Sequence, residues 1–392
     1  MPTAKPLLLD VSRLIWRRWA GLRPTGIDRI CLAWLEQYNQ HAQAVFIHRR
    51  GQTILSERAS EKLFSLLSDT GDHHDAQKSF RRRMIDLALR HGTSLLSTRD
   101  GKGRIWLNPG HTGLDVPTLR QWCQKVNVRP VYLVHDLIPI THPEYCRDGE
   151  ALRHRRRMLT VLETGAGVVA NSQHTLDSLA SFAAAEKQAL PPAIVAWPGT
   201  PALTGASTGV SEEPAFIILG TIEGRKNHII LLKIWERLWQ KLGPRAPRLL
   251  VIGRRGWQAH DVIRLLDSSS LGDRLVETGP LDDNSIAQHL ANARALLFPS
   301  FAEGYGLPLV EAMAAKVPVI ASDLAVFREI GQGVPDLLCP DDLDAWEAVI
   351  LDYARPESTR RSAQMERLAG FKAPTWTDHF SRIDRFLGEL QA

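Results

Sequence analysis

The feature that most constrains the fold is a regular alternation of two residue patterns across the second half of the chain. Short, apolar, β-rich segments are separated by stretches in which apolar residues repeat at helical spacing. The β-rich segments are Phe216–Thr221, Arg248–Gly253, Arg274–Thr278, Ala295–Ser300, Val317–Ser322 and Asp336–Cys339. The helical stretches are Asn227–Leu242, Asp261–Ser269, Asp283–Ala293, Leu307–Ala315 and Val326–Gly331. This alternation predicts βαβ units, a parallel sheet and a doubly wound α/β domain.

The loop after the fourth β-rich segment carries two carboxylates at a fixed separation. Glu303 lies in the loop, and Glu311 lies in the helix that the pattern predicts after it. Between them, Gly304, Gly306 and Pro308 predict a tight turn. Glycines let backbone amides approach a ligand closely, and a helix N-terminus offers N–H groups to phosphate or sugar oxygens. The pattern predicts a binding site here; the alternative is an ordinary strand–loop–helix joint with two solvated glutamates.

A second polar loop follows the first β-rich segment and leads into a helix. It contains Arg225, Lys226 and Asn227 in succession, so a guanidinium and an ammonium stand beside a helix N-terminus. Such a pair can neutralise a diphosphate, with Asn227 as the helix cap, although a solvated basic pair at a helix start is the alternative. The next β-rich segment ends in Gly253 and Arg254, which predicts a tight turn at the strand end, but glycine-rich strand exits are common.

The first half of the chain is less regular but has the same character. Further strands are predicted at Leu7–Val11, Ala44–His48, Arg104–Leu107, Val131–His135, Gly167–Ala170 and Ile194–Trp197. The pattern also predicts an amphipathic helix at Gly26–Asn39, two inserted helices within Glu57–Leu96 and another at Asp148–Glu163.

Two candidate positions in this half follow predicted strands. His135 and Asp136 form a pair at the end of an apolar strand, where a histidine is either catalytic or a satisfied core residue. Ser172 stands where a strand turns into a helix, and it is either a substrate contact or simply a helix N-cap.

A Pro/Gly/Ser/Thr-rich stretch marks the domain boundary. It predicts a first domain at residues 1–198, a linker at 199–214 and a second domain at 215–374. Residues 375–392 form a last segment with apolar residues at helical spacing. A chain of 392 residues is too long for one ordinary core and suits two domains of similar size.

Composition limits the class of protein. Hydrophobic residues at 44% and charged residues at 23% are typical of a globular chain. The cysteines are scattered without a CxxC pair, which predicts reduced thiols and no metal site; they are Cys31, Cys123, Cys146 and Cys339. No apolar run is long enough to span a bilayer, and the apolar N-terminal segment is too short for a signal peptide, so we expect a cytoplasmic protein.

The formal net charge of +5 is unevenly distributed. Basic residues cluster at 81–83 and 153–157, and further arginines flank Trp16 and Trp19. These runs are either solvated helix faces or a surface that meets anionic lipid or a diphosphate-linked acceptor at the inner face of the cell membrane. Nucleic acid is a poor candidate partner because no nucleic-acid-binding motif accompanies the charge.

Together these motifs resemble those of retaining nucleotide-sugar glycosyltransferases with the GT-B fold, in particular the large family 4. Glu303 and Glu311 match the family's two glutamates separated by seven residues, and residues 131–139 resemble its Val-His-Asp-Leu-Ile-Pro segment. Residues 223–227 match its Glu-Pro-Arg-Lys-Asn loop except that Gly224 replaces proline, which predicts a more mobile loop. The likeness is strong from residue 216 to 330 and looser before residue 198. It implies two Rossmann-like domains facing a central cleft, with the last helix packing back towards the first.

The resemblance also implies roles for individual residues. Arg225 and Lys226 would stabilise the departing diphosphate, Glu303 would hold hydroxyls of the donor sugar, and Glu311 would hold the ribose. His135 would position the sugar or the acceptor. The N-terminal turn at residues 24–29 matches the family's glycine-rich loop but has one glycine instead of two adjacent ones. The donor contacts implied are Gly26, Arg225, Lys226, Asn227, Gly253, Arg254, Glu303, Gly304, Tyr305, Gly306, Leu307 and Glu311. The acceptor-side residues implied are Asp28, Arg29, Asp136 and Ser172.

The implied reaction transfers a hexose from a nucleotide diphosphate sugar to a hydroxyl with retention at the anomeric carbon, without a metal or other cofactor. GDP-mannose is the expected donor, because the His-Asp-Leu-Ile-Pro and Arg-Lys-Asn-His sequences are frequent in bacterial mannosyl- and rhamnosyltransferases. The expected acceptor is a growing glycan or a lipid-linked glycan of a surface polysaccharide.

Other classes stay open to different degrees. A two-carboxylate glycoside hydrolase would not need the Arg-Lys pair, and an NAD-dependent oxidoreductase is disfavoured because no GxGxxG follows a strand into a helix. A catalytically silent nucleotide-sugar-binding subunit of a glycan-assembly complex is the main alternative.

Overall fold

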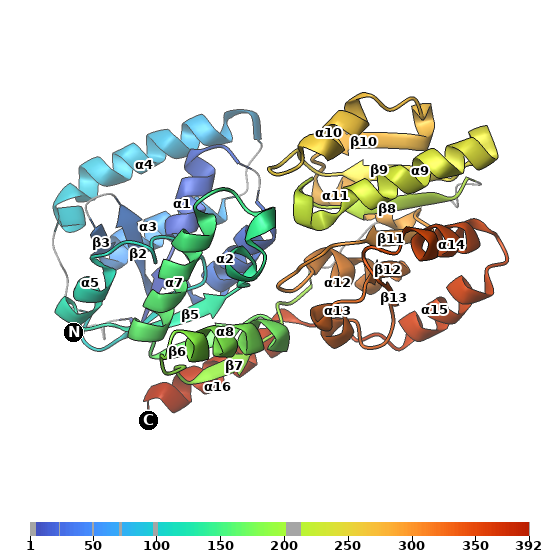
Figure 1. The fold of residues 1–392 in the computed structure, drawn as a ribbon. Coiled ribbons are helices and arrows are strands. Elements are labelled where there is room, and N and C mark those ends of the chain that lie inside the picture. Colours follow the sequence, from blue (N-terminus) through green and yellow to red (C-terminus); the bar gives the residue numbers. More distant parts are fainter. Residues whose placement is uncertain are drawn as a thin grey trace. The chain divides into compact units, whose positions relative to one another are not determined.

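The computed structural model describes residues 5–22, 24–48, 51–69, 73–96, 101–200 and 213–391. The chain divides into two compact units, which Figure 1 shows as ribbons. The first contains residues 1–137, 152–198 and 376–392, and the second contains residues 138–151 and 199–375. The C-terminal helix therefore belongs with the N-terminal part of the chain, and a short segment from the first half belongs with the second unit. Most of the linker expected at 199–214 lies outside the described residues.

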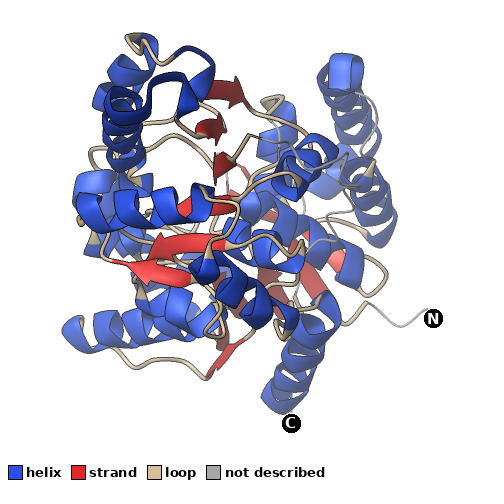
Figure 2. Ribbon diagram, turned by 90° about the vertical axis from the view of Figure 1, so that its right-hand side faces the viewer, coloured by secondary structure: helices blue, strands red, loops and turns tan. Residues whose placement is uncertain are grey.

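The first unit is built on a sheet of seven strands in the order β3-β2-β1-β4-β5-β6-β7. These strands are β1 (Leu7–Asp10), β2 (Ala42–His48), β3 (Gly51–Ile54), β4 (Ile105–Asn108), β5 (Arg129–Val134), β6 (Gly167–Ala170) and β7 (Ala193–Val195). All neighbours are parallel except β3, which pairs antiparallel with β2 as a hairpin absent from the expected elements. The helices of this unit are α1 (Ser12–Trp19), α2 (Gly26–Tyr38), α3 (Glu57–Ser68), α4 (His73–Leu96), α5 (Leu119–Lys125), α7 (Glu150–Thr164), α8 (Gln173–Ala185) and α16 (Trp376–Gln391). Figure 2 shows helices on either side of the strands.

The second unit is a six-stranded, fully parallel sheet in the order β10-β9-β8-β11-β12-β13. Its strands are β8 (Ala215–Leu219), β9 (Arg248–Ile252), β10 (Leu275–Gly279), β11 (Ala295–Phe298), β12 (Val319–Ser322) and β13 (Asp336–Leu338). Its helices are α6 (Ile138–Thr141), α9 (His228–Leu242), α10 (His260–Asp267), α11 (Asp283–Ala291), α12 (Leu307–Ala314), α13 (Ala325–Ile330), α14 (Leu343–Ala354) and α15 (Thr359–Ala369). The order reverses direction between β8 and β11. In such sheets, ligands bind at the carboxyl ends of the strands beside that reversal.

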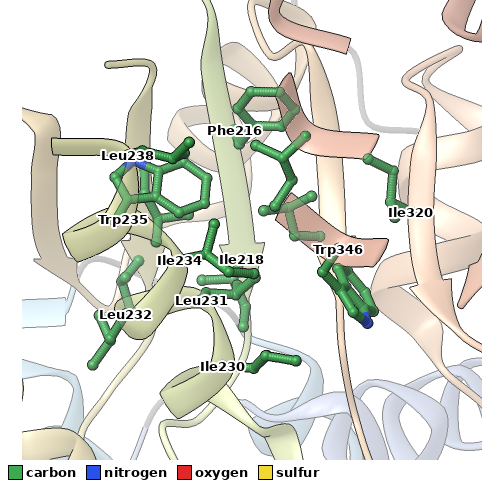
Figure 3. Packing of buried hydrophobic residues seen from close by; sticks show 14 of the residues in the cluster. Phe216, Ile218, Ile230, Leu231, Leu232, Ile234, Trp235, Leu238, Ile320 and Trp346 are labelled. Carbon is green, nitrogen blue, oxygen red and sulfur yellow. The ribbon is translucent and has the colours of Figure 1, made fainter. Parts of the chain in front are cut away.

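The core of the second unit holds β8 rigidly at this reversal. Phe216 and Ile218 of β8 pack with Trp235 of α9 and Trp346 of α14 (Figure 3). Both indole N–H groups are satisfied, because Trp235 donates to Pro247 O at 2.8 Å and Trp346 donates to Cys339 O at 2.9 Å. Burying each such side chain stabilises the fold by roughly 1.5–3 kcal/mol, so the strand whose end carries the basic loop is firmly fixed.

The last helix, α16, packs within the first unit through buried polar contacts. Trp34 of α2 donates its indole N–H to His379 Nε2 at 3.0 Å, and Tyr38 donates to Asp384 at 2.8 Å. On its other nitrogen, His379 Nδ1 donates to the carbonyls of Ala196 and Trp197 at 3.2 and 3.1 Å. Burial lowers the pKa of His379 to about 4, so the ring is neutral at physiological pH and can serve both roles.

Candidate active site

A buried cluster of charges lies where β8 and β11 end. The loop after β8 forms a short 3₁₀ turn at Gly224–Lys226, and the loop after β11 contributes Glu303. Arg225 bonds Glu303 at 2.8 Å and Ala302 O at 2.9 Å, and Lys226 forms a very short ion pair with the same carboxylate. The two loops are also joined through their backbones, since Phe301 N donates to Arg225 O at 2.8 Å. The loops after β8 and β11, which are far apart in the sequence, are thus joined by ion pairs and hydrogen bonds where the strand order reverses.

The electrostatics of this cluster keep Glu303 ionised. Burial alone would raise the pKa of its carboxyl, but Arg225 and Lys226 outweigh that effect and hold the pKa at about 2. Ser300 adds a hydrogen bond of 3.0 Å to the same carboxylate. Arg225 also pairs with Glu223 at 2.8 Å, a partner that was not expected from the sequence. The cluster therefore holds two cations against two buried carboxylates.

Packing around position 224 explains why a glycine is found there. A Cβ there would lie 2.8 Å from Gln258 O and 3.5 Å from the Tyr145 ring. Tyr145 stacks on Phe301 with ring planes 1° apart and centroids 5.3 Å apart, and Gln258 bonds Cys146 O at 3.2 Å. A proline at position 224 would require the Gln258 carbonyl to move.

Asn227 takes a different role from the expected one. It occupies the position before α9 in the left-handed conformation, at φ 52°, which asparagine tolerates better than most residues. Its side chain makes no capping bond and instead donates to Pro340 O at 2.9 Å. The predicted side-chain cap is therefore wrong, because the amide ties the basic loop to the segment after β13.

The turn after β9 carries two adjacent arginines, of which one is paired with carboxylates among the described residues of the same unit and the other is not. Gly253 lies against the first loop, and a Cβ on it would approach Gly220 O to 1.8 Å. Arg255 is held by Glu277 at 2.7 Å and by Asp267 at 2.6 Å. Arg254, by contrast, has no ion pair among the described residues and is half-buried, so its charge is available to a ligand.

The second glutamate of the pair is placed on a helix. Glu311 is buried within α12, which starts at Leu307 directly after the turn of Gly304, Tyr305 and Gly306. Tyr305 is buried as well. The structure thus brings Glu303 to the cationic cluster and Glu311 to the helix that follows it.

In the first unit, a buried polar cluster lies where three neighbouring strands end. Asn108 ends β4, His135 follows β5 and Asn171 follows β6, and all three are buried. Asn171 donates to His135 O at 2.8 Å, and His111 donates its backbone N–H to Asn108 at 3.1 Å. The rings of His111 and His135 lie 4.9 Å apart, centroid to centroid.

Each member of this polar cluster carries a buried atom that has no hydrogen-bond partner among the described residues. These atoms are Asn108 Nδ2, His111 Nε2, His135 Nδ1 and Asn171 Oδ1. Buried polar groups are otherwise nearly always paired, so a concentration of unpaired ones indicates a polar binding site. The sequence reasoning missed Asn108 and His111; the signal was Asn-Pro-Gly-His directly after an apolar strand.

His135 has a defined protonation state. Its Nε2 donates to Pro109 O at 2.7 Å, so Nδ1 carries the lone pair. Burial lowers the pKa of His135 to about 4 despite that bond. The ring is therefore neutral at physiological pH and can accept a hydrogen bond from a hydroxyl but cannot donate one from Nδ1.

Two of the expected acceptor-side residues have structural partners. Asp28 completes a capping box at the start of α2 with Thr25, and its carboxylate also pairs with Arg13 at 2.7 Å and Arg17 at 2.9 Å. Ser172 is the N-cap of α8 and accepts from Thr175 N at 3.0 Å, which confirms the alternative of a helix cap. Gly26 is the first residue of α2, and Arg29 and Asp136 are half-buried.

Most of the expected basic surface is engaged in pairs within the first unit. Arg153 bonds Asp115 at 2.8 Å and Arg155 bonds Glu186 at 2.7 Å. Arg81 donates to Trp19 O at 2.8 Å, and its guanidinium lies 5.5 Å from the centroid of the Trp19 ring. These arginines are exposed, but each has a partner within its own unit.

The burial of His228, the first residue of α9, predicts that the protein loses stability at low pH. It is buried among Ile218, Leu231 and Leu249, and neither ring nitrogen has a partner among the described residues. Burial, reinforced by the nearby charge of Lys226, lowers its pKa to about 3. The unfolded chain binds a proton on this ring more readily than the folded protein does. The free energy of unfolding therefore decreases as the pH falls from about 6.5 towards 3.

The substitution His228→Leu should remove this dependence. Between pH 7 and pH 5, wild type should lose about 2 kcal/mol more free energy of unfolding than the variant. Urea unfolding at both pH values measures the difference, and parallel losses in the two proteins would show that His228 titrates normally. Other buried histidines contribute equally to both proteins and cancel.

Among the described residues, no group of three or more His, Cys, Asp or Glu side chains is arranged to hold a metal ion. None of the described helices combines the length and the apolar character needed to cross a bilayer.

Comparison with known proteins finds a family match within the second unit. Residues 213–355 match the family described as Glycosyl transferases group 1. The chain is 30% identical over 222 residues to the serotype-specific mannosyltransferase WbdA of Escherichia coli, covering 51% of this chain and 27% of WbdA. It is 32% identical over 160 residues to O-antigen chain mannosyltransferase B of Escherichia coli, covering 41% and 42%. The matches thus span less than half the length of these relatives.

Solved structures show the fold of the entire chain. HepE of Anabaena, crystallised with UDP, superposes with a TM-score of 0.65 at 16% identity, covering 98% of this chain and 99% of HepE. Sucrose-phosphate synthase of Thermosynechococcus elongatus gives a TM-score of 0.62 at 16% identity with the same coverage. The chain therefore has the GT-B fold, as expected from the sequence.

Proposed function

We propose, from the premise that residues 213–355 form a group 1 glycosyltransferase domain, that this protein is a retaining hexosyltransferase. It transfers a hexose, which we propose is mannose, from a nucleotide diphosphate sugar to a hydroxyl of a growing or lipid-linked glycan. The product belongs to a bacterial surface polysaccharide, and the protein works at the cytoplasmic side of the cell membrane.

The observation that carries the proposal is the charge cluster at the reversal between β8 and β11. Arg225 and Lys226 lie within the sequence between a strand end and the start of α9, where phosphate groups bind in doubly wound sheets. Arg254, after the neighbouring strand β9, adds a positive charge with no ion pair among the described residues. Charge that develops on a departing diphosphate is stabilised most by such fixed cations in a water-poor setting.

Mannose is supported by the relatives, because WbdA and O-antigen chain mannosyltransferase B are both described as mannosyltransferases. GDP is our proposal, whereas HepE was crystallised with UDP and with UDP-glucose, so UDP donors form the comparison.

The proposed chemistry needs no covalent intermediate. The bond between the anomeric carbon and the diphosphate oxygen breaks, the acceptor oxygen bonds to that carbon on the same face, and the acceptor proton passes to the departing phosphate. Glu303, held ionised by Arg225 and Lys226, accepts hydrogen bonds from hydroxyls of the donor sugar. The neutral His135 and its polar neighbours recognise hydroxyls without repelling or attracting charge.

A transfer assay with a panel of nucleotide sugars tests the proposal. We expect GDP-mannose to stabilise the protein in a thermal-shift screen more than UDP-glucose or UDP-N-acetylglucosamine. A ligand at a hundred times its dissociation constant adds roughly 2.7 kcal/mol. Product NMR should show the anomeric configuration of the donor. Donor binding without transfer to any mannan-type acceptor would instead support a silent nucleotide-sugar-binding subunit.

The same assay includes an EDTA arm. Because Arg225 and Lys226 supply the charge that a metal ion supplies in other transferases, activity should be unchanged by EDTA. Loss of activity with EDTA and its return with Mn²⁺ would contradict this part of the proposal.

A further inference from the structure

Helix α4 presents an exposed stripe that its own unit does not use. The stripe consists of Lys78, Arg82, Ile85 and Leu89, which are spaced at i, i+4, i+7 and i+11. At 3.6 residues per turn, these side chains project within about 60° of one another. The opposite side of the helix holds it to the unit, since Phe80 is buried and the Arg18 guanidinium lies 5.3 Å from the centroid of its ring.

The apolar half of the stripe is unusually exposed for large aliphatic side chains. Ile85 is 52% exposed and Leu89 is 80% exposed, the latter being the most exposed large hydrophobic residue in the part of the chain that the structure describes. Single exposed apolar residues are common on soluble proteins. Two of them adjacent on one helix face, in line with cations, form an amphipathic arrangement instead.

The basic half of the stripe is unpaired. Neither the Lys78 nor the Arg82 side chain has an ion pair or hydrogen bond among the described residues, and both are exposed. Their neighbours are occupied, because Arg83 pairs with Asp69 at 2.9 Å and Arg90 pairs with Asp86 at 2.7 Å. Asp86 is the one carboxylate within residues 77–90, against five Lys or Arg residues.

We propose that the stripe of Lys78, Arg82, Ile85 and Leu89 docks α4 on an anionic lipid surface. Cations beside aliphatic side chains on one face are the chemistry of an interfacial helix, in which the charges meet phosphate head groups and the aliphatic groups enter the acyl boundary. A second copy of the chain fits poorly, because it would bring the same positive charges face to face. The inference goes beyond the glycosyl transfer proposed above and does not depend on it (α4 is labelled in Figure 1).

The stripe shares Arg82 with the basic run at residues 81–83 and does not include the run at residues 153–157. The run at residues 153–157 offered the largest block of arginines, but Arg153, Arg155 and Arg157 face carboxylates of their own unit at 2.8, 2.7 and 3.5 Å. Lipid phosphate would have to displace those partners, whereas it would meet Lys78 and Arg82 directly.

Sedimentation with vesicles tests the proposal on the full chain. Wild type should bind vesicles of phosphatidylcholine containing phosphatidylglycerol at low salt and should bind pure phosphatidylcholine vesicles far more weakly. The double substitution Lys78→Ser and Arg82→Ser should weaken binding to the anionic vesicles by about thirtyfold, since each basic residue near such a surface contributes about fivefold. Ile85→Ser and Leu89→Ser together should leave binding weak even at low salt.

The matched control removes the same charge elsewhere in the unit. Arg155→Ser and Arg156→Ser lower the net charge by the same two units on α7, and this variant should bind the anionic vesicles within about threefold of wild type. Equal binding by wild type and both stripe variants, or loss only in the α7 variant, would overturn the assignment, as would no binding by wild type at low salt. All four stripe residues are exposed, so thermal unfolding should be unchanged. Donor-induced thermal shifts, measured without vesicles, test the glycosyltransferase proposal separately.

Discussion

The double substitution Arg225→Ala and Lys226→Ala is expected to lower kcat/KM for the donor by a hundredfold to ten-thousandfold. A hydrogen bond to a charged group contributes about 1.5–3 kcal/mol, so each residue accounts for ten- to a hundredfold. The loss should appear in donor binding as well as in turnover, because both side chains lie in the loop that we assign to the diphosphate. Isothermal titration with free GDP and initial-rate kinetics with donor measure the two parts.

The control for this variant is Arg255→Ala. Arg255 is a nearby cation after β9, but Glu277 and Asp267 hold it at 2.7 and 2.6 Å on an exposed surface. Its removal should change donor kinetics by less than about threefold. Near-normal GDP binding by the double variant would remove Arg225 and Lys226 from the diphosphate site, whatever happens to Arg255→Ala.

The substitutions Glu303→Gln and Glu311→Gln are expected to fail in different ways. Glu303→Gln should spare binding of free nucleotide and depress turnover, since we assign this carboxylate to the sugar. It should also destabilise the protein by about 3 kcal/mol or more, because Lys226 then loses the counter-ion of a buried pair. Glu311→Gln should weaken binding of donor and free nucleotide alike, with a smaller change in stability.

Three measurements separate these effects. Calorimetry with free GDP and UDP reports nucleotide binding, rate measurements at saturating donor report turnover, and thermal unfolding reports the buried pair. If Glu311→Gln spares the nucleotide while Glu303→Gln loses it, the two roles are exchanged. If Glu303→Gln is as stable as wild type, the ion pair with Lys226 does not form in solution.

The parallel sheet of the second unit could be predicted because its signal is local. Most strands from β8 to β13 are short apolar runs, and the loops after β8 and β11 carry their functional residues within a few positions. A polar loop after an apolar strand can be recognised from the sequence alone. Because parallel strands end on the same edge of the sheet, such loops can be expected to lie close together. The same logic found His135 after β5.

The partners of those residues could not be predicted, because pairing depends on contacts between distant segments. Nothing in the sequence indicates that Glu303 neutralises Lys226 across 77 residues, or that Asp28 is already held by two arginines. The partners of the arginine run at residues 153–157 were hidden for the same reason, because Asp115 and Glu186 lie tens of residues away. Asn108 and His111 were missed because a lone Asn or His after a strand is common, and only their convergence with His135 and Asn171 distinguishes them.

The way the chain divides between the two units limits how this protein can be recombined. A fusion made at the apparent boundary near residue 200 would exchange the second half of the sequence but not a complete unit. Residues 138–151, whose Tyr145 stacks on Phe301, would come from one parent, and α16, whose His379 meets Trp34, would come from the other. A chimera that swaps donor specificity therefore needs three junctions, near residues 137, 151 and 375, in addition to the one in the linker. Natural exchange of sugar specificity in such a chain should accordingly proceed by point substitution around the loops more readily than by domain shuffling.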